Sequence, residues 1–307
     1  MPQRISTARG REFGEGVRAA INASGMTARR VAELAGWQEA KLSDFVNGKI
    51  GCTKTELAVL LGICRTPVEE RDRLLNLLPE THVQGWWQQH GSCAPARLRT
   101  LIQNVESAKT LTTWNPHGLP AFLQSVDYVR AVIVASPNVP DVEMDRRVKA
   151  VKELQELLFG RGLQCTFFLH EHALQLPVGS HEVHVGQVHH LLLMAVRRNV
   201  TIRILPTVVG AHAGMSGAFT QLTFPAYEPL VFLEHQSSTL IEEKKAAVEA
   251  YQEVVHSLDR ASLDAEQSKT ALRRLGERLS AADFSGPARL LPGALAGGVS
   301  FTGNHRL

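Results

Sequence analysis

The stretch MTARRVAELAGWQEAKLSDFVNGK, residues 26–49, decides the fold of the N-terminal part of this chain. Thr27 is a residue type that caps the start of a helix, and apolar residues recur after it at helical spacing. Gly36 tolerates the positive φ of a tight helix-ending turn, and Ala32 is small enough for two backbones to approach. A second amphipathic run follows over residues 38–47. The spacing predicts two short helices that cross at a large angle.

Helical patterns flank this pair on both sides. Apolar residues recur at helical spacing over 13–21, and Thr53 and Pro67 are residue types that begin helices. Pro79 ends the block. We therefore expect an all-α domain of five helices, a helix-turn-helix domain, over residues 1–80.

The remainder of the chain mixes helical patterns with strand patterns. Short runs of β-branched and aromatic residues have strand length, and they lie at 165–169, 200–205, 218–224 and 230–234. Helical patterns cover 96–111, 120–135, 141–160, 184–197, 238–258 and 264–279. The expected fold class is α+β, with a C-terminal helical domain that contains a small β-sheet. Its expected parts are a hinge at 81–95, a regulatory or dimerisation domain at 96–280, and a flexible tail at 281–307.

Charge is unevenly distributed along the 307 residues. Residues 1–54 carry nine Lys and Arg against five Asp and Glu, whereas the remaining residues carry 24 against 25. A basic N-terminal part favours a polyanionic partner there. No run of about 18 uncharged apolar residues exists, and the N-terminal MPQRISTARGREFGEG lacks the apolar stretch of a signal peptide. We therefore expect no membrane partner and a cytoplasmic, nucleoid-associated protein.

The quoted stretch resembles the Cro/repressor-type (xenobiotic-response-element, XRE) helix-turn-helix family. The family pattern is T-Q-x-x-L-A-x-x-x-G-V-S-x-x-x-[IV]-S-x-[IL]-E-x-G. The matching positions here are Thr27, Ala28, Val31, Ala32, Gly36, Trp37, Gln38, Leu42, Ser43, Phe45, Asn47 and Gly48. The resemblance implies that the second helix of the pair enters the major groove of double-stranded DNA.

Polar residues on these two helices are the candidate DNA contacts. The residues that we expect to bind DNA are Thr27, Arg29, Arg30, Gln38, Glu39, Lys41, Ser43 and Lys49. Glu39 stands where the family has a base-reading glutamine, and a glutamate can accept a hydrogen bond from cytosine N4. The cations can contact phosphates, or they can be ordinary solvated charges. The arginines at positions 4, 9 and 11 are a possible DNA-wrapping arm.

Several ordered motifs in the second part resemble the C-terminal domain of unknown function of many actinobacterial regulators, sometimes called Scr-type antitoxin-like. They include LPAFLQSVDYVRAV at 119–132, RRNVTIRILP at 197–206 and GAHAGMSGAFTQLTFP at 210–225. In that family a small partner protein, encoded nearby, often accompanies the regulator. The tentative partner or ligand residues are Trp86, Trp87, Glu106, Gln124 and Tyr128.

Two chemical sites are considered and set aside. Six histidines crowd into residues 170–190, but the HEVH run at 181–184 spaces its two histidines one residue short of the zinc-protease pattern. Ser216 lies in a glycine-rich run that falls short of G-x-S-x-G. We therefore expect no metal, no cofactor and no enzymatic activity.

Two functions remain open. The first is a sequence-specific DNA-binding transcriptional regulator, working as a homodimer and controlled through its second domain by a small partner protein or a ligand. The second is an antitoxin-like protein that mainly binds and neutralises a small partner protein. Ala28 and Glu39, which depart from the family pattern, favour the second function because they weaken DNA contacts.

Overall fold

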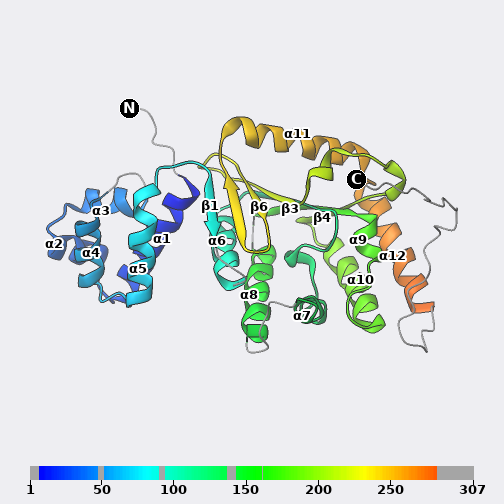
Figure 1. The fold of residues 1–307 in the computed structure, drawn as a ribbon, viewed down its shortest axis with the longest axis horizontal. Coiled ribbons are helices and arrows are strands. Elements are labelled where there is room, and N and C mark those ends of the chain that lie inside the picture. The colour runs from blue at the N-terminus through cyan, green and yellow to red at the C-terminus, as the bar shows by residue number, and fades with distance from the viewer. Residues whose placement is uncertain (1–6, 48–51, 90–93, 137–142, 161, 282–307) are drawn as a thin grey trace, which may run out of the picture.

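The structure is a computed structural model that describes residues 7–47, 52–89, 94–136, 143–160 and 162–281. It contains a group of helices at the N-terminal end and a larger part built around one β-sheet (Figure 1). The α+β fold class is therefore confirmed. The predicted tail lies outside the described residues, apart from its first residue.

Five helices form the N-terminal domain, as the pattern of apolar residues predicted. They are α1 (Ala8–Ala23), α2 (Ala28–Ala35), α3 (Glu39–Val46), α4 (Lys54–Ile63) and α5 (Val68–Leu77), followed by the short 3-10 turn η1 (Leu78–Glu80). Their apolar faces meet in a common core, whose fully buried members include Val17, Val31, Phe45, Leu57 and Leu74.

The larger part is organised by a seven-stranded mixed sheet with the strand order β1-β7-β6-β5-β2-β3-β4. The strands are β1 (Trp86–Gln89), β2 (Thr110–Asn115), β3 (Gln164–His170), β4 (Val200–Leu205), β5 (Phe219–Thr223), β6 (Leu230–Glu234) and β7 (Ser238–Glu242). Strands β2, β3 and β4 run parallel to one another, and the other neighbouring pairs are antiparallel.

Helices cover both faces of this sheet (Figure 1). One face carries α6 (Ala94–Glu106), η2 (Ala121–Leu123), α7 (Val126–Val134), α8 (Met144–Glu156), η4 (Leu157–Phe159), α9 (Glu171–Gln175), α10 (His181–Ala195) and α12 (Ala265–Ala281). The other face carries the long helix α11 (Lys245–Ala261), which follows β7. The short turns η5 (Thr207–Val209) and η6 (Ala213–Ser216) connect β4 to β5, and η6 contacts α11. Successive side chains along a strand point to opposite faces of the sheet, so each strand contributes to the core on both faces. In β3, for example, Phe167 belongs to the core under α6, and Phe168 to the core under α11.

Three strands were not predicted. Residues 86–89 fall in the expected hinge and instead form the edge strand β1, which pairs with β7. Residues 110–115 and 238–242 were assigned to helices or loops and form β2 and β7. The threonine-rich β2 and the short β7 carry a weak local signal, and pairing with other strands of the sheet stabilises them. The sheet is accordingly larger than the small sheet that was expected.

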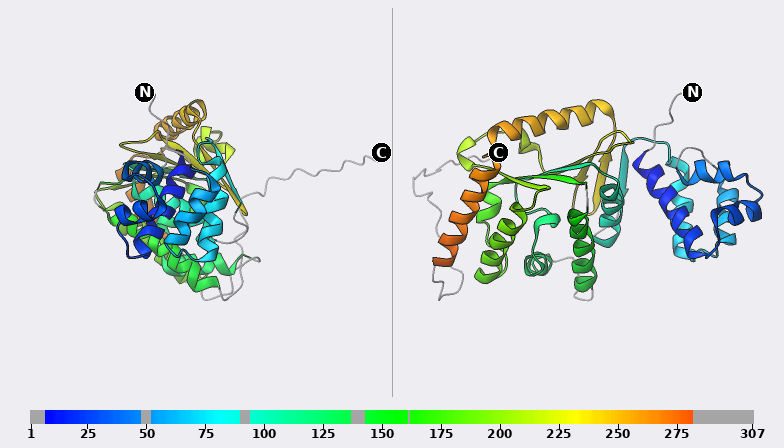
Figure 2. Two further views of the ribbon diagram at one scale, coloured as in Figure 1. Left: turned by 90° about the vertical axis from the view of Figure 1, so that its left-hand side faces the viewer. Right: turned by 180° about the vertical axis from the view of Figure 1, so that it is seen from behind.

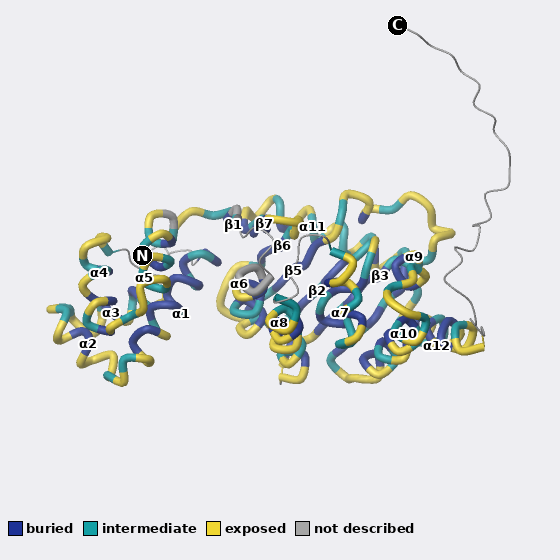
Figure 3. Tube along the Cα trace, turned by 60° about the horizontal axis from the view of Figure 1, so that its bottom comes forward, coloured by how far each residue is buried: buried dark blue, intermediate teal, exposed yellow. Residues whose placement is uncertain are grey.

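The N-terminal domain stands at one end of the molecule. Figure 2 shows it beside the β1 edge of the sheet, with α1 and α5 nearest the sheet and α2, α3 and α4 farther away. Exposed residues dominate the outer surface of α2 and the loop ends around it in Figure 3. Within the described residues, no helix combines the length and the apolar character needed to cross a bilayer.

Candidate functional site

The turn between α2 and α3 has the geometry that its residues predicted. The Thr27 hydroxyl accepts a hydrogen bond from the Arg30 amide at 3.2 Å and so caps α2. Gly36 ends that helix with φ 69° and ψ 28°, in the left-handed region. The Trp37 amide then donates to the Ala32 carbonyl at 2.8 Å, which closes the turn.

The inner side of α3 is anchored by aromatic residues. Phe45 is fully buried, and its ring meets those of Phe13 at 5.2 Å and Trp37 at 5.3 Å, both edge to face. Leu42 is buried one turn earlier. These contacts determine which side of α3 faces outward.

The outer side of α3 is polar and exposed. Gln38, Glu39 and Ser43 are all exposed, as is Asn47 at the end of the helix. Gln38 makes no capping hydrogen bond with its side chain, so its amide is not committed to the end of the helix. The side-chain amide of Asn47 donates a hydrogen bond to the Ser43 carbonyl at 2.8 Å. Helix α1 makes the main contact with the second domain, through α6, and Asn47 lines a cavity together with Asn104 and Tyr227 of that domain.

Exposed ion pairs connect α2 to the start of α3. Arg29 Nε lies 3.3 Å from Glu33 and 3.2 Å from Glu39, and Arg30 lies 3.2 Å from Glu33. The two arginines lower the pKa of Glu33 by hydrogen bonding, Arg30 most of all. Exposed pairs of this kind contribute little stability, so a phosphate can replace the carboxylates at small cost.

Lys41 has a structural role that its sequence position did not show. Its Nζ lies 2.5 Å from Glu56 Oε1 on α4 and 4.4 Å from the centre of the Trp37 ring. The Lys41 hydrogen bond, together with the cap at Thr53, holds the pKa of Glu56 at about 2. Lys41 therefore ties α3 to α4, and its phosphate contact stays a prediction. Lys49 lies outside the described residues.

For Arg9 and Arg11, the structure contradicts the prediction of a DNA-wrapping arm. Arg11 lies between the domains, 5.1 Å from the Phe224 ring and 4.9 Å from the Tyr227 ring, and donates to Asn104 at 2.8 Å. Arg9 lies 5.5 Å from the Trp86 ring. The two guanidinium groups stack on aromatic side chains of the second domain, and this contact removes water from them. They are therefore directed toward the second domain rather than toward the α3 surface. Arg4 lies outside the described residues.

A buried carboxylate joins the two domains. Glu12 on α1 is 4% exposed, accepts from the Thr100 hydroxyl of α6 at 2.6 Å and pairs with Arg73 at 2.9 Å. Burial raises its pKa, although Thr100 and Arg73 act in the opposite direction. Gln88 of β1 donates to the same hydroxyl at 3.0 Å. The contact therefore links α1, α6 and β1 in one network.

A second buried carboxylate lies at the start of α1. Glu243, directly after β7, accepts from the Ala8 amide at 2.7 Å. A carboxylate at a helix N-terminus is favourable, because the first amides of the helix lack partners. Burial nevertheless raises the pKa of Glu243.

The tentative partner residues do not form one site. Trp86 is buried in β1 beside the N-terminal domain, Trp87 follows it in the strand, and Glu106 is exposed at the end of α6. Tyr128 is buried on α7, and that burial raises its pKa. Gln124 lines a cavity beside α6, and its side-chain amide donates to the Leu119 carbonyl at 2.7 Å, whereas Glu106 lines a different and smaller cavity.

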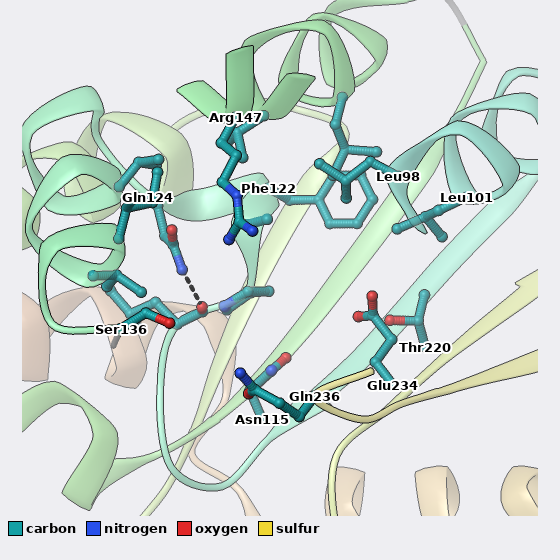
Figure 4. Close-up of a pocket in the computed structure, with 18 residues that line it drawn as sticks. Leu98, Leu101, Asn115, Phe122, Gln124, Ser136, Arg147, Thr220, Glu234 and Gln236 are labelled. Carbon is teal, nitrogen blue, oxygen red and sulfur yellow. Dashed lines mark hydrogen bonds between the residues drawn. The ribbon is translucent and has the colours of Figure 1, made fainter. Parts of the chain in front are cut away.

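The cavity that Gln124 lines has a volume of about 300 Å³ and lies between α6, α7, α8 and the ends of three strands (Figure 4). Its apolar lining includes Leu98, Leu101, Leu119, Phe122, Val129, Ile133, Val151 and Leu154. Its polar lining includes Asn115, Gln124, Ser136, Arg147, Thr220, Glu234 and Gln236. Sequence reasoning found only Gln124 among these. Arg147 and Glu234 are far apart in the chain, and no local pattern connects them.

Two of the six crowded histidines, His170 and His184, contact the backbone, and so does His212 outside that group. His170 and His212 accept through Nδ1 from the amides of residues 172 and 214, at 3.1 and 3.2 Å, and so cap α9 and η6. His184 lies 2.9 Å from the Leu174 carbonyl. Burial lowers the pKa of His170 and His212. Across the described part of the chain, no three His, Cys, Asp or Glu side chains are grouped as metal ligands.

Comparison with known families divides the chain at the same place as the structure. Residues 98–274 match a family described as a domain of unknown function, DUF5753. Residues 12–74 match a family described as a helix-turn-helix domain, which supports a DNA-binding regulator. No curated protein and no solved structure matches the chain.

Proposed function

Because this chain belongs to the DUF5753 family and its N-terminal residues match a helix-turn-helix domain, we propose that it is a sequence-specific, dimeric transcriptional regulator. The observation that carries this proposal is that Gln38, Glu39 and Ser43, at the start and along the outer side of α3, are all exposed. An eight-residue helix is about 12 Å long, and the major groove is about 12 Å wide.

Base recognition is assigned to the first turn of α3. An amide such as that of Gln38 suits adenine, and the carboxylate of Glu39 suits cytosine N4. Arg29 holds Glu39 at 3.2 Å, so this carboxylate reaches a base only when the arginine turns toward a phosphate. Thr27, Arg30 and Ser43 complete the proposed contact surface.

Dimerisation follows from the small size of this reading surface. A single helix of this length contacts only a few base pairs, and two copies related by two-fold symmetry double the contacts across half-sites one helical turn apart. The second domain is the proposed dimerisation and control domain. It supplies no catalytic group in this proposal.

Control of DNA binding is assigned to the contact between the domains. Helix α6 holds α1 through Thr100 and Asn104, and Glu243 holds the start of α1. A small partner protein or a ligand that displaces α6 or the end of β7 would therefore change how the N-terminal domain is presented.

A gel shift with the chain's own upstream DNA, repeated at rising salt, tests the proposal. Binding is expected to weaken steeply with salt, because each phosphate contact releases counterions. The variant Gln38→Ala should weaken specific binding about 5- to 150-fold and leave non-specific binding unchanged. The variant Arg30→Ala should weaken both and lower the salt slope by about one.

The matched control is Arg71→Ala, a partly exposed arginine on α5 that pairs with Asp72 of the same helix. It is expected to bind DNA like the unaltered chain. Absence of any salt-dependent shift, or equal loss in all three variants, would contradict the proposal.

The antitoxin-like alternative rests on a specific feature of the same surface. Glu39 places a carboxylate on the reading edge, where phosphates repel it, and Ala28 lacks the glutamine that contacts phosphate in the similar family. If that function holds, the chain captures a small protein in a pull-down from its own cells while the gel shift stays negative.

A further inference from the structure

Helix α10 presents a stripe of exposed residues on the side opposite its buried ones. We propose that α10 pairs with α10 of a second copy of the chain, antiparallel and across a two-fold axis, and that this pair is the centre of the dimer interface. The inference rests on the dimer in the proposed function and names the surface that forms it. The pairing itself requires no DNA.

The stripe consists of Glu182, Gly186, His189, Leu193 and Val196, all exposed in the part of the chain that the structure describes. Their spacing alternates between four and three residues, which is the spacing of a coiled-coil seam. The side chains of Leu193 and Val196 are 67% and 71% exposed. Single exposed apolar residues are ordinary, but two on one seam favour a contact surface.

The opposite side of α10 is fixed within the second domain. Val188, Leu191 and Met194 are buried there. Helix α12 packs closely on this side, since a Cβ at Gly276 would lie 3.6 Å from Val188. Figures 1 and 3 show α10 at the surface, on the sheet face opposite α11. The stripe is therefore presented by a helix that is held in place, and not by a loop.

Gly186 lies in the middle of α10, and the space that its Cβ would occupy is open. Glycine is a poor helix former, and neither a positive φ nor a close neighbour among the described residues requires it here. A second helix that approaches closely does require a small residue. In a helix pair, the glycine leaves a hole that a leucine side chain can fill.

One two-fold axis accounts for the apolar and the charged residues together. When the axis passes opposite residues 189–190, Gly186 of one copy faces Leu193 of the second copy. The same axis places Glu182 of one copy opposite Arg197 of the second copy, at both ends of the pair. The two pairings differ in chemistry and agree on one register. This self-complementarity favours a second copy of the chain over an unrelated protein.

The charges at the two ends of α10 determine the direction of the pair. Glu182 lies in the first turn and accepts from the Ser180 hydroxyl at 2.9 Å, and Arg197 follows the helix with its guanidinium 4.1 Å from the centre of the Phe159 ring. A carboxylate accepts several hydrogen bonds, and a stacked guanidinium keeps N–H groups at its edge. An antiparallel pair joins these unlike charges, whereas a parallel pair would set like charges side by side.

The proposed interface is separate from the proposed DNA-binding surface. Helix α10 contacts β4 at one edge of the sheet, and the N-terminal domain stands beside β1 at the other edge (Figure 2). The α10 pair therefore does not use the exposed residues of α3.

Sedimentation of the full chain without DNA, over a range of concentrations, measures the dimer. The unaltered chain is expected to form a dimer that dissociates on dilution. Leu193→Arg and Gly186→Gln should each weaken it about tenfold or more, because each change occurs twice in a two-fold interface. Glutamine favours a helix more than glycine does, so the second variant tests close approach and not the stability of α10.

The control is Val208→Arg, which changes a 91% exposed apolar residue on η5. It should dimerise like the unaltered chain. Thermal unfolding of each variant shows whether it is folded.

Exchange of the end charges tests the register. Glu182→Arg and Arg197→Glu should each weaken the dimer about fivefold or more at low salt, because each sets like charges together at both ends of the pair. The chain that carries both changes should dimerise like the unaltered chain, because unlike charges then meet again.

Three results would overturn the inference. They are a chain that stays monomeric, a dimer that neither Leu193→Arg nor Gly186→Gln weakens, and a combined charge exchange that fails to restore the dimer. A gel shift without salt dependence would instead overturn the proposed DNA binding and leave this interface standing, because sedimentation involves no DNA.

Discussion

At the scale of single residues, Gly36 shows how one position determines the angle between α2 and α3. Its φ of 69° lies in the left-handed region, and space around its Cα is open. The requirement for glycine is therefore a matter of backbone conformation rather than of packing.

Replacement of Gly36 by valine is expected to lower the free energy of unfolding by about 1–2 kcal/mol, because a β-branched residue is strained at this φ. Urea unfolding measures the change. Gly62→Ala is the matched control, because Gly62 lies within α4 with open space around it. It should raise stability by up to about 1 kcal/mol. Equal effects of the two changes would contradict this explanation.

The cations show the opposite case, in which residue type alone misleads. Arg11 and Lys41 both looked like phosphate contacts in the sequence. The structure places Arg11 against Tyr227 and Lys41 against Glu56. Long basic side chains are equally suited to DNA, to carboxylates and to aromatic rings, so only the neighbours decide.

At the scale of elements, α4 begins with a complete capping box. Thr53 accepts from the Glu56 amide at 3.1 Å, and Glu56 accepts from the Thr53 amide at 2.8 Å. Because Glu56 also holds Lys41, the start of α4 helps to hold α3, the candidate recognition helix.

The variant Thr53→Ala is expected to lower the free energy of unfolding by about 1 kcal/mol, because one amide of the first turn loses its acceptor. It should also weaken DNA binding through a looser α3. Chemical denaturation and the gel shift measure the two effects. Thr55→Ala, an exposed change within α4, is the control. Loss of stability of the same size in both variants would show that the cap is not the cause.

The strands illustrate how far local pattern extends. β3, β4, β5 and β6 have apolar, β-branched sequences and were predicted near their observed bounds. β1 and β7 pair at the edge of the sheet, through Trp86 opposite Ile241, and were missed. These two strands are stabilised by pairing with strands that the fold brings beside them. The local sequence pattern of one segment does not indicate which distant segment will pair with it.

At the scale of the whole molecule, buried carboxylates hold the DNA-binding domain to the sheet. Burial raises the pKa of Glu12 and of Glu243. The folded chain therefore keeps these protons to a higher pH than the unfolded chain does. Each group makes stability fall as pH rises from the ordinary carboxyl pKa through the raised one.

The variant Glu243→Gln should gain stability relative to the unaltered chain as pH rises through that window, because glutamine carries no titrating proton. Urea unfolding from pH 4 to 8, on both chains, measures the difference. His170, His190 and His212, whose pKa values burial lowers, act in the opposite sense, but equally in both chains. Glu228→Gln, an exposed change, is the control. A constant difference across pH would contradict the role of Glu243.

The sequence by itself determined the helix-turn-helix, because Thr27, Gly36 and the apolar spacing around them act over a few residues of chain. It also determined the four most apolar strands for the same local reason. Only the tertiary structure decided where Arg11 and Lys41 lie, which polar segments join the sheet, and that Arg147 and Glu234 face one cavity. These outcomes depend on residues that are distant in the chain. The energy of burying a side chain, or of forming an ion pair, depends on the groups that surround it in the folded protein and not on the type of residue alone.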